Sequence, residues 1–109
     1  MNLIEVGMSF REFAEKTWSF PAEFVDRRYL GPVHGNGMVA EYPIILYPDF
    51  FDEGGQDGVF EANMTVCVES YLGSIHGGEG VKLEEQVLIT THGVEGLTTY
   101  PYESRLLAS

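Results

Sequence analysis

The sequence has few basic residues to balance its acidic ones. Seventeen of its 109 residues are acidic and six are lysine or arginine, which gives a formal net charge of −11. Most of the surplus lies in residues 33–109, where only Lys82 and Arg105 are basic. Direct binding to nucleic-acid phosphates is therefore not expected. The charge favours either an acidic face that binds cations or a basic partner, or simple solubility.

Cysteine and long apolar runs are also scarce. The lone Cys67 excludes an internal disulfide framework and is typical of a reducing compartment, so we expect a cytoplasmic protein. No apolar run approaches the roughly 20 residues of a membrane-spanning helix, and Met1 to Val6 is too short and acidic for a signal peptide. The 44% of hydrophobic residues indicates a globular chain with a modest core.

The stretch 64–91 predicts a β-hairpin with a glycine-rich turn between its arms. If the loop is symmetric about its centre, Val66 faces Val87 and Glu69 faces Glu84. Two carboxylates about 5 Å apart repel by roughly 3 kcal/mol at an effective dielectric constant near 20, so this pair should destabilise the sheet. A shared proton, a nearby lysine or arginine, or a bound cation would offset the repulsion. The alternative is a register shifted by one pair, with both glutamates in water.

The chain begins with the patterns of two helices. Ser9 and Glu12 form a capping box at the start of the first, which we expect to continue to about residue 18. Pro21 and Gly31 are typical of the first turn and the exit of the second. The apolar side chains expected to be buried are Phe10, Phe13, Ala14 and Trp18 in the first helix, and Phe24, Val25 and Tyr29 or Leu30 in the second.

The middle and end of the chain indicate strands and turns. Residues 38–47 form an extended run in which Pro43 marks an edge or a bulge. The acidic stretch 49–57 lacks the spacing of a calcium-binding loop, so we expect a solvated turn. Three further stretches are interpreted as an alternating strand, a turn and a final strand or loop: 59–72, 92–96 and 97–106.

Two helices followed by a mostly antiparallel sheet predict an α+β domain. One face of the alternating strand is apolar, and the other carries polar side chains that include Cys67 and Glu69. We expect the helices to cover the apolar face. The polar face, with Glu69 and Glu84, would have no covering layer from this chain, so a functional site or a missing partner is expected there.

Four motifs occur in order: His34-Gly35-Asn36-Gly37, Glu41-Tyr42-Pro43, residues 66–71 and residues 80–90. This set resembles the C-terminal half of the "pita-bread" catalytic domain. That family includes methionine aminopeptidase, aminopeptidase P, prolidase, creatinase and a dimethylsulfoniopropionate lyase branch. The resemblance covers the chain from Gly7 onward. It implies a curved, mostly antiparallel sheet carrying two N-terminal helices, within one partial catalytic domain at residues 1–109.

The resemblance also implies a metal site. The family holds two divalent metals with two aspartates, one histidine and two glutamates, and the motifs place His34, Glu69 and Glu84 at the histidine and glutamate positions. A divalent ion (Mn, Fe, Co or Zn) would replace the repulsion between the glutamates with ligation. The two aspartates belong to an upstream hairpin that this sequence does not contain, and the aspartates of residues 49–57 do not replace them.

The implied activity is metal-dependent hydrolysis of the amide bond before a proline. Glu69 would move protons as well as bind metal, and Glu41 would orient the substrate. Ala40 stands near the place where many peptidases have a second histidine and the lyase branch an acidic base, which counts against simple lyase chemistry. The alternatives are a fragment of a lyase-like metalloenzyme, or a non-catalytic acidic module that docks a complementary subunit.

The remaining expectations concern partners and nearby side chains. A missing half would leave sheet edges exposed, so we expect self-association or a subunit that supplies the aspartates, and a peptide or small-molecule substrate once the site is complete. Glu85 should point away from Glu84 and be structural. His76 and His92 are expected to be exposed turn residues, with a place at a substrate mouth as the alternative.

Overall fold

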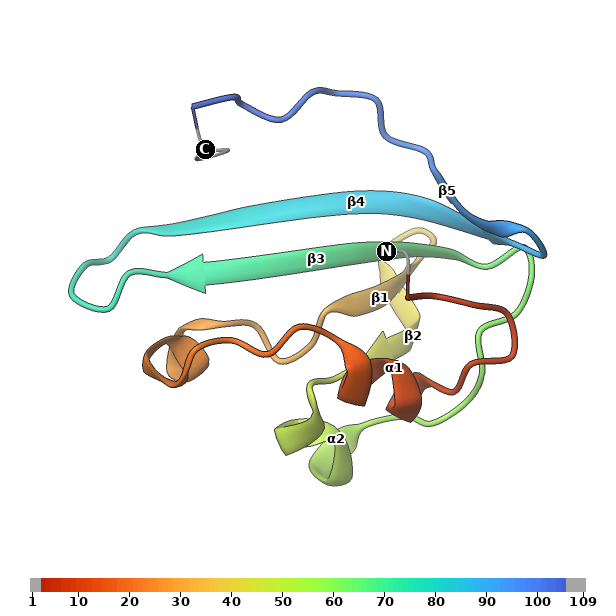
Figure 1. Cartoon of the computed structure of the whole chain (residues 1–109), viewed down its shortest axis with the longest axis horizontal. Coiled ribbons are helices and arrows are strands. Elements are labelled where there is room, and N and C mark those ends of the chain that lie inside the picture. Colours follow the sequence, from red (N-terminus) through yellow and green to blue (C-terminus); the bar gives the residue numbers. More distant parts are fainter. Residues whose placement is uncertain (1–2, 106–109) are drawn as a thin grey trace.

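The computed structural model describes residues 3–105 and shows an α+β fold around one antiparallel sheet (Figure 1). The five strands lie in the order β2-β1-β3-β4-β5, so the long β3–β4 hairpin is flanked by shorter strands. This architecture confirms the predicted fold class. The strands are β1 (Val33–Asn36), β2 (Ala40–Ile45), β3 (Thr65–Gly73), β4 (Gly80–Thr90) and β5 (Gly93–Gly96).

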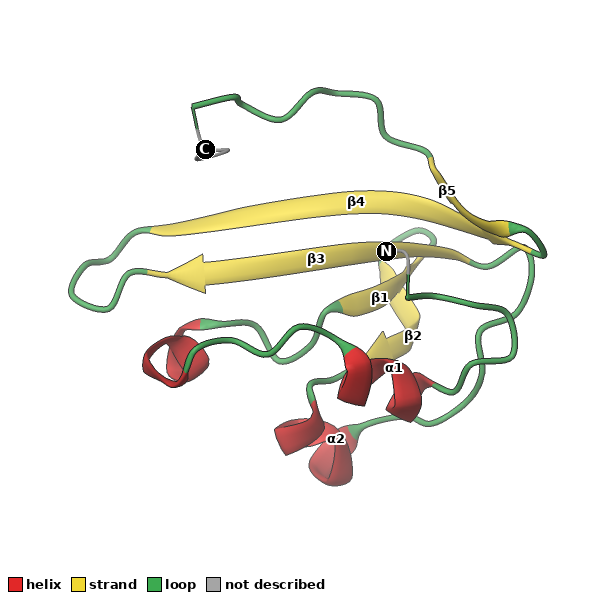
Figure 2. Cartoon of the chain, in the orientation of Figure 1, coloured by secondary structure: helices red, strands yellow, loops and turns green. Residues whose placement is uncertain are grey.

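In residues 3–105, three short helices accompany the sheet and lie below the β3–β4 hairpin in the view of Figure 2. They are α1 (Phe10–Lys16), the 3₁₀ helix η1 (Ala22–Arg27) and α2 (Pro48–Gly54). The capping box predicted for α1 is present, since the Glu12 N–H donates to Ser9 Oγ at 3.0 Å. Within the described residues no helix is long and apolar enough to cross a bilayer.

The hydrophobic core joins α1 to the sheet. Phe60 is fully buried, and its ring packs edge-on against Phe10 at 5.1 Å and Phe13 at 5.6 Å between centroids. Val66 and Val87 face this cluster from the centre of the hairpin. The other buried members of the cluster are Ile4, Ala14, Val33, Ile45, Phe51 and Ile89.

The predicted hairpin register is correct. Val66 pairs with Val87 and Glu69 pairs with Glu84, so the shifted alternative is excluded. Pro43 lies on β2, an edge strand, as the sequence predicted.

The first helix is shorter than expected, and Trp18 is not buried. The helix ends at Lys16 because Thr17 takes an extended conformation, with φ −66° and ψ 156°. Pro21 then keeps the preceding residue out of the α region. Trp18 is 66% exposed and packs edge-on against Phe20 instead of joining the core.

The second predicted helix is a 3₁₀ helix without a fully buried residue. It ends at Arg27, so Tyr29 and Leu30 fall beyond it and are exposed. Tyr29 stacks on Tyr71 of β3, with centroids 4.8 Å apart. The side chain buried in this region is a charged one, Arg28, at 6% exposure.

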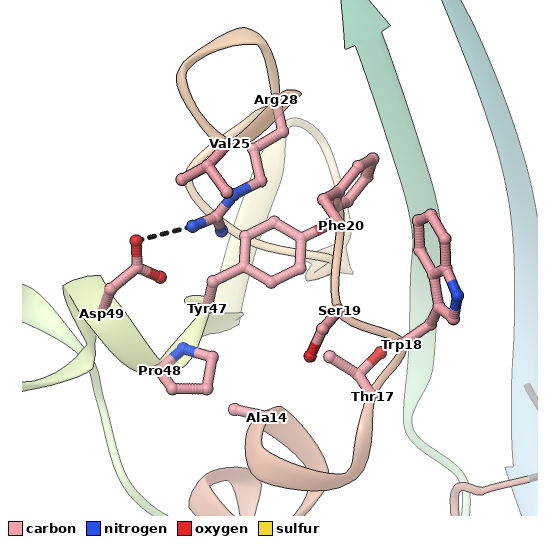
Figure 3. Close-up of a pocket in the computed structure, with 10 residues that line it drawn as sticks. All are labelled: Ala14, Thr17, Trp18, Ser19, Phe20, Val25, Arg28, Tyr47, Pro48 and Asp49. Carbon is pink, nitrogen blue, oxygen red and sulfur yellow. Dashed lines mark hydrogen bonds and ion pairs between the residues drawn. The ribbon is translucent and has the colours of Figure 1, made fainter. Parts of the chain in front are cut away.

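Residues 49–54 of the acidic stretch expected to be a solvated turn lie in the helix α2, with Phe51 buried, and residues 55–57 follow it without regular structure. Pro48 at its first position, Asp49 in its first turn and Gly55 directly after it are helix signals that outweigh the acidic composition. Arg28 fixes this helix: its Nη2 lies 2.6 Å from Asp49 Oδ2, and its guanidinium lies 4.2 Å from the Tyr47 ring centroid (Figure 3).

Two strand boundaries also differ from the predictions. Regular pairing in β3 begins at Thr65, because Asn63 has a positive φ of 74° and the segment before it turns. Residues 93–96 form the edge strand β5 on β4, so the turn lies at Thr91 and His92. The chain from Leu97 to Arg105 is irregular, and residue 106 of the predicted last segment lies outside the described residues.

Candidate metal centre

Three adjacent strands bring the predicted ligands to one face of the sheet. His34 on β1 pairs with Cys67 on β3, and Glu69 on β3 pairs with Glu84 on β4. Successive side chains of a strand alternate between faces, so Cys67 and Glu69 share a face. This is the face opposite Val66 and the core.

The strand β1 carries an irregularity at the site itself. Its register on β2 shifts between His34 and Gly35, which marks a bulge, a feature that re-aims neighbouring side chains. Gly35 is required there, because a Cβ at this position would lie 2.0 Å from the carbonyl oxygen of Tyr42. The backbone thus holds the imidazole of His34 over the β3–β4 hairpin.

The three predicted ligands converge. His34 Nε2 lies 3.3 Å from Glu84 Oε1 and 3.7 Å from Glu69 Oε2. His34 Nδ1 lies 2.9 Å from the carbonyl oxygen of Gly35, and an Nδ1–H that donates to this oxygen would leave the lone pair of Nε2 available to a metal ion. A histidine held in this way is oriented as a metal ligand.

Lys82 supplies the positive charge that the paired glutamates require. Its Nζ lies 2.7 Å from Glu69 Oε2 and 3.0 Å from Glu84 Oε2. The contacts to Glu69 and then to Glu84 raise the pKa of Lys82, and the ammonium is the main cause that lowers the pKa of Glu84. The repulsion between Glu69 and Glu84 was expected to be offset by a shared proton, a nearby basic residue or a cation. The structure shows the basic residue, Lys82.

Glu69 is nearly buried and already has a cationic partner. Its side chain is 11% exposed, and its Oε2 lies 2.7 Å from the ammonium of Lys82. A nearly buried carboxylate needs a positive charge of this kind beside it. The chemistry of the donors therefore fits a divalent ion, with the ammonium of Lys82 as its competitor.

Cys67 is a member of the cluster that the sequence reasoning did not assign to the site. One possible ligand atom each from His34, Cys67 and Glu84 lies within 4.8 Å of the others. Burial and then the Glu84 carboxylate raise the pKa of the Cys67 thiol to about 11. The signal was present in the sequence, because Cys67 stands two residues before Glu69 on the same face of a strand.

The other singled-out residues lie apart from the cluster. Glu41 on β2 pairs with Gly35 and is exposed, with its carboxylate against Gly37 rather than among the convergent ligand atoms. Glu85 points to the other face and accepts hydrogen bonds from Thr98 and Tyr102. Ala40 is exposed at the start of β2, and His76 and His92 are exposed in turns, as predicted for the two histidines.

Comparison with known proteins settles the family. Residues 1–91 match the model of metallopeptidase family M24, and this range contains all three predicted ligands. The chain belongs to metallopeptidase family M24. M24 enzymes generally use divalent metals, in keeping with the donors found on β1, β3 and β4.

The curated relatives of this M24 chain are lyases. It is 36% identical over 107 residues to the dimethylsulfoniopropionate lyase DddP of Roseovarius nubinhibens and to that of Roseobacter denitrificans. Each match covers 98% of this chain and 24% of the relative. The chain therefore spans about a quarter of the length of the curated relatives it matches.

A solved structure shows the same fold. The X-Pro aminopeptidase of Thermotoga maritima superposes with a TM-score of 0.65 and 24% sequence identity over 92% of this chain and 27% of that one. The likeness confirms the predicted pita-bread fold. The short coverage agrees with the prediction that the chain corresponds to a part of such a catalytic domain.

Proposed function

We propose that this chain contributes His34, Glu69 and Glu84 to the divalent-metal centre of an M24 hydrolase that cleaves the peptide bond before proline. The observation that carries the proposal is the convergence of these side chains, with His34 Nε2 at 3.3 Å and 3.7 Å from the two carboxylates. Membership in metallopeptidase family M24 supports it, because the matched residues 1–91 include all three side chains.

Each residue has a distinct part. A bound divalent ion lowers the pKa of a water molecule and polarises a carbonyl. His34 and Glu84 would hold the ion, and Glu69 would take and return the proton of the attacking water as well as bind the ion. Glu41, exposed on the neighbouring hairpin, orients the substrate from outside the ligand set.

Three ligands from this chain leave the family's site incomplete. We infer that the two aspartates come from another part of the molecule or from a complementary subunit, and that the chain self-associates or pairs accordingly. The length of the relatives supports this inference, since the chain matches about a quarter of each. Sedimentation that shows a monomer at high concentration, with or without metal, would count against self-association.

Lyase activity on dimethylsulfoniopropionate is the second candidate, because the two curated relatives carry that name at 36% identity over nearly the whole chain. Against it stands Ala40, whose methyl group cannot serve as a base. A lyase would need Glu69 or a group outside this chain to remove the proton. Assaying the protein with a Xaa-Pro peptide and with dimethylsulfoniopropionate separates the two candidates.

Metal binding is the direct test of the proposed centre. The purified full chain should retain a stoichiometric divalent ion after dialysis against Mn, Fe, Co or Zn, measured by elemental analysis. Glu84→Gln and His34→Asn should each lower the affinity by at least about tenfold.

Matched controls are available in the same chain. Glu95→Gln and His92→Asn alter exposed residues of the same types and should bind metal as the wild type does. If the wild type binds no metal at millimolar supply, the proposed centre is wrong for this chain. The acidic docking module would then be the better interpretation.

A further inference from the structure

Cys67 lies beside two of the three predicted metal ligands, His34 and Glu84. It pairs directly with His34 across β1 and β3, and it precedes Glu69 by two residues on the same face. The ligand atoms of His34, Cys67 and Glu84 lie within 4.8 Å of one another. The ligands of the family are aspartates, glutamates and a histidine, which bind through oxygen and nitrogen. Cys67 would add a sulfur atom to them.

We propose that Cys67 is a sulfur ligand of the metal centre and directs it to a thiophilic ion such as Zn²⁺ or Co²⁺ rather than Mn²⁺ or Mg²⁺. The inference rests on the proposed function, because it concerns the same site. Thiolate ligands select soft and borderline ions, whereas carboxylates and water suit Mg²⁺ and Mn²⁺. Coordination by the thiolate releases one proton from Cys67 to solvent.

Three donors of different kinds come together in this cluster. The ligand atoms of His34, Cys67 and Glu84 lie within 4.8 Å of one another. Donors of a tetrahedral zinc site lie about 3.3 to 3.8 Å apart, given metal–ligand bonds of about 2.0 to 2.3 Å, so side-chain rotations of about one ångström would bring these three atoms onto one ion. Three protein ligands with water in the fourth position are the set of a catalytic zinc site.

The surroundings of Cys67 differ from those of a cysteine that only fills space. A structural cysteine lies among apolar groups and is inert. Cys67 is 7% exposed yet lies on the polar face, beside an imidazole and a carboxylate. The carboxylate of Glu84, which also contacts the Lys82 ammonium at 3.0 Å, keeps this part of the sheet polar and charged.

Cobalt spectroscopy of the full chain tests the inference. With a phosphine reductant present, Co²⁺ at one equivalent should give intense visible bands of four-coordinate cobalt and a near-ultraviolet sulfur-to-cobalt charge-transfer band. Cys67 is the only cysteine, so that band can arise only from Cys67. Cys67→Ser should abolish it and weaken Zn²⁺ binding by at least about tenfold, while Mn²⁺ binding changes little.

Each outcome separates the inference from the proposed function. Visible bands that disappear in Glu84→Gln, without a near-ultraviolet band in the wild type, would overturn ligation by Cys67 and leave the proposed centre standing. Failure of the wild type to bind Co²⁺ at all would overturn both. The wild-type spectrum decides the question even if Cys67→Ser does not fold, and His92→Asn should reproduce that spectrum.

Discussion

Two opposed glutamates on neighbouring strands define the chemistry of this protein at the scale of single residues. Their pairing follows from the hairpin register, and the repulsion it implies is of the order of 3 kcal/mol before compensation. Lys82, on β4 two residues before Glu84, provides that compensation. An ammonium in this position stabilises the metal-free chain and competes with a metal ion for the same oxygens.

Replacing this ammonium should therefore have opposite effects on stability and on metal binding. Lys82→Met is expected to lower the free energy of unfolding of the metal-free chain by about 1 to 3 kcal/mol, because it leaves two opposed carboxylates, one of them only 11% exposed, without a counter-charge. The same change should raise Zn²⁺ affinity severalfold. Urea unfolding with a chelator and calorimetric titration with Zn²⁺ measure the two effects.

Lys16→Met is the matched control for this prediction. Lys16 forms an exposed ion pair with Glu12 on α1, with Nζ and Oε1 2.6 Å apart. Its loss should cost a few tenths of a kcal/mol at most and leave metal affinity unchanged. Equal metal affinities for the wild type and Lys82→Met would show that the ammonium and the metal do not share a position.

At the scale of elements, the helix α2 depends on a contact from a distant segment. Arg28 lies just after η1, and its guanidinium is enclosed by Asp49 and the rings of Tyr47 and Phe50. The Arg28 side chain is only 6% exposed, and its charge partner is the half-exposed carboxylate of Asp49. Local helix signals start α2, and this ion pair ties it to the rest of the fold.

The hydrogen bond from Arg28 lowers the pKa of Asp49 below its ordinary value of 3.8. A folded-state pKa below the unfolded one contributes stability that is present above pH 3.8 and is lost as the pH falls through the folded value. Asp49→Asn should therefore be less stable than the wild type at pH 7, by about 1 kcal/mol since Asp49 is half exposed. The difference should shrink below pH 3.8 when unfolding is followed from pH 7 to pH 2.

Asp52→Asn provides the comparison within the same helix. Asp52 pairs with Arg11 at 3.1 Å, but both side chains are well exposed. Its substitution should change the free energy of unfolding by less than about 0.5 kcal/mol at pH 7. A similar cost for both variants would show that burial of Arg28 adds nothing to the ion pair.

At the scale of the whole molecule, a three-ring contact joins the N-terminal helix to the sheet. Phe10, Phe13 and Phe60 pack edge to face, and Phe60 comes from a segment that is not part of any strand. Its ring holds α1 against the core from the loop between α2 and β3. The helix side of the fold therefore depends on contacts between residues about 50 positions apart, as the numbering of these rings shows.

Phe60→Ala should destabilise the chain by about 3 to 5 kcal/mol through lost burial and the resulting cavity. That is a large part of the roughly 5 to 15 kcal/mol that stabilises a typical domain. Thermal unfolding followed by circular dichroism measures the loss. Tyr100→Ala, at a residue 92% exposed, should leave the midpoint nearly unchanged. A Phe60 variant as stable as the wild type would show that the ring cluster does not hold the fold together.

Local patterns in the sequence determined much of the candidate site. Strand alternation and the symmetry of a glycine-rich turn were sufficient to place Glu69 opposite Glu84, since pairing within a hairpin depends on the turn between its arms. The His-Gly motif identified His34, and a bulge with Gly35 explains why the motif has a glycine there. The fold class followed from the same periodicities.

Only the tertiary structure decided which groups complete the site and which are buried. It placed Cys67 against His34, because β1 and β3 pair across some 30 residues and no local pattern reports such a pairing. It also put Lys82 between the two glutamates, left Trp18 exposed and buried Arg28. The alternation of side chains along a strand determines the face of the sheet on which each one lies. Which side chain of another strand it contacts there depends on long-range packing.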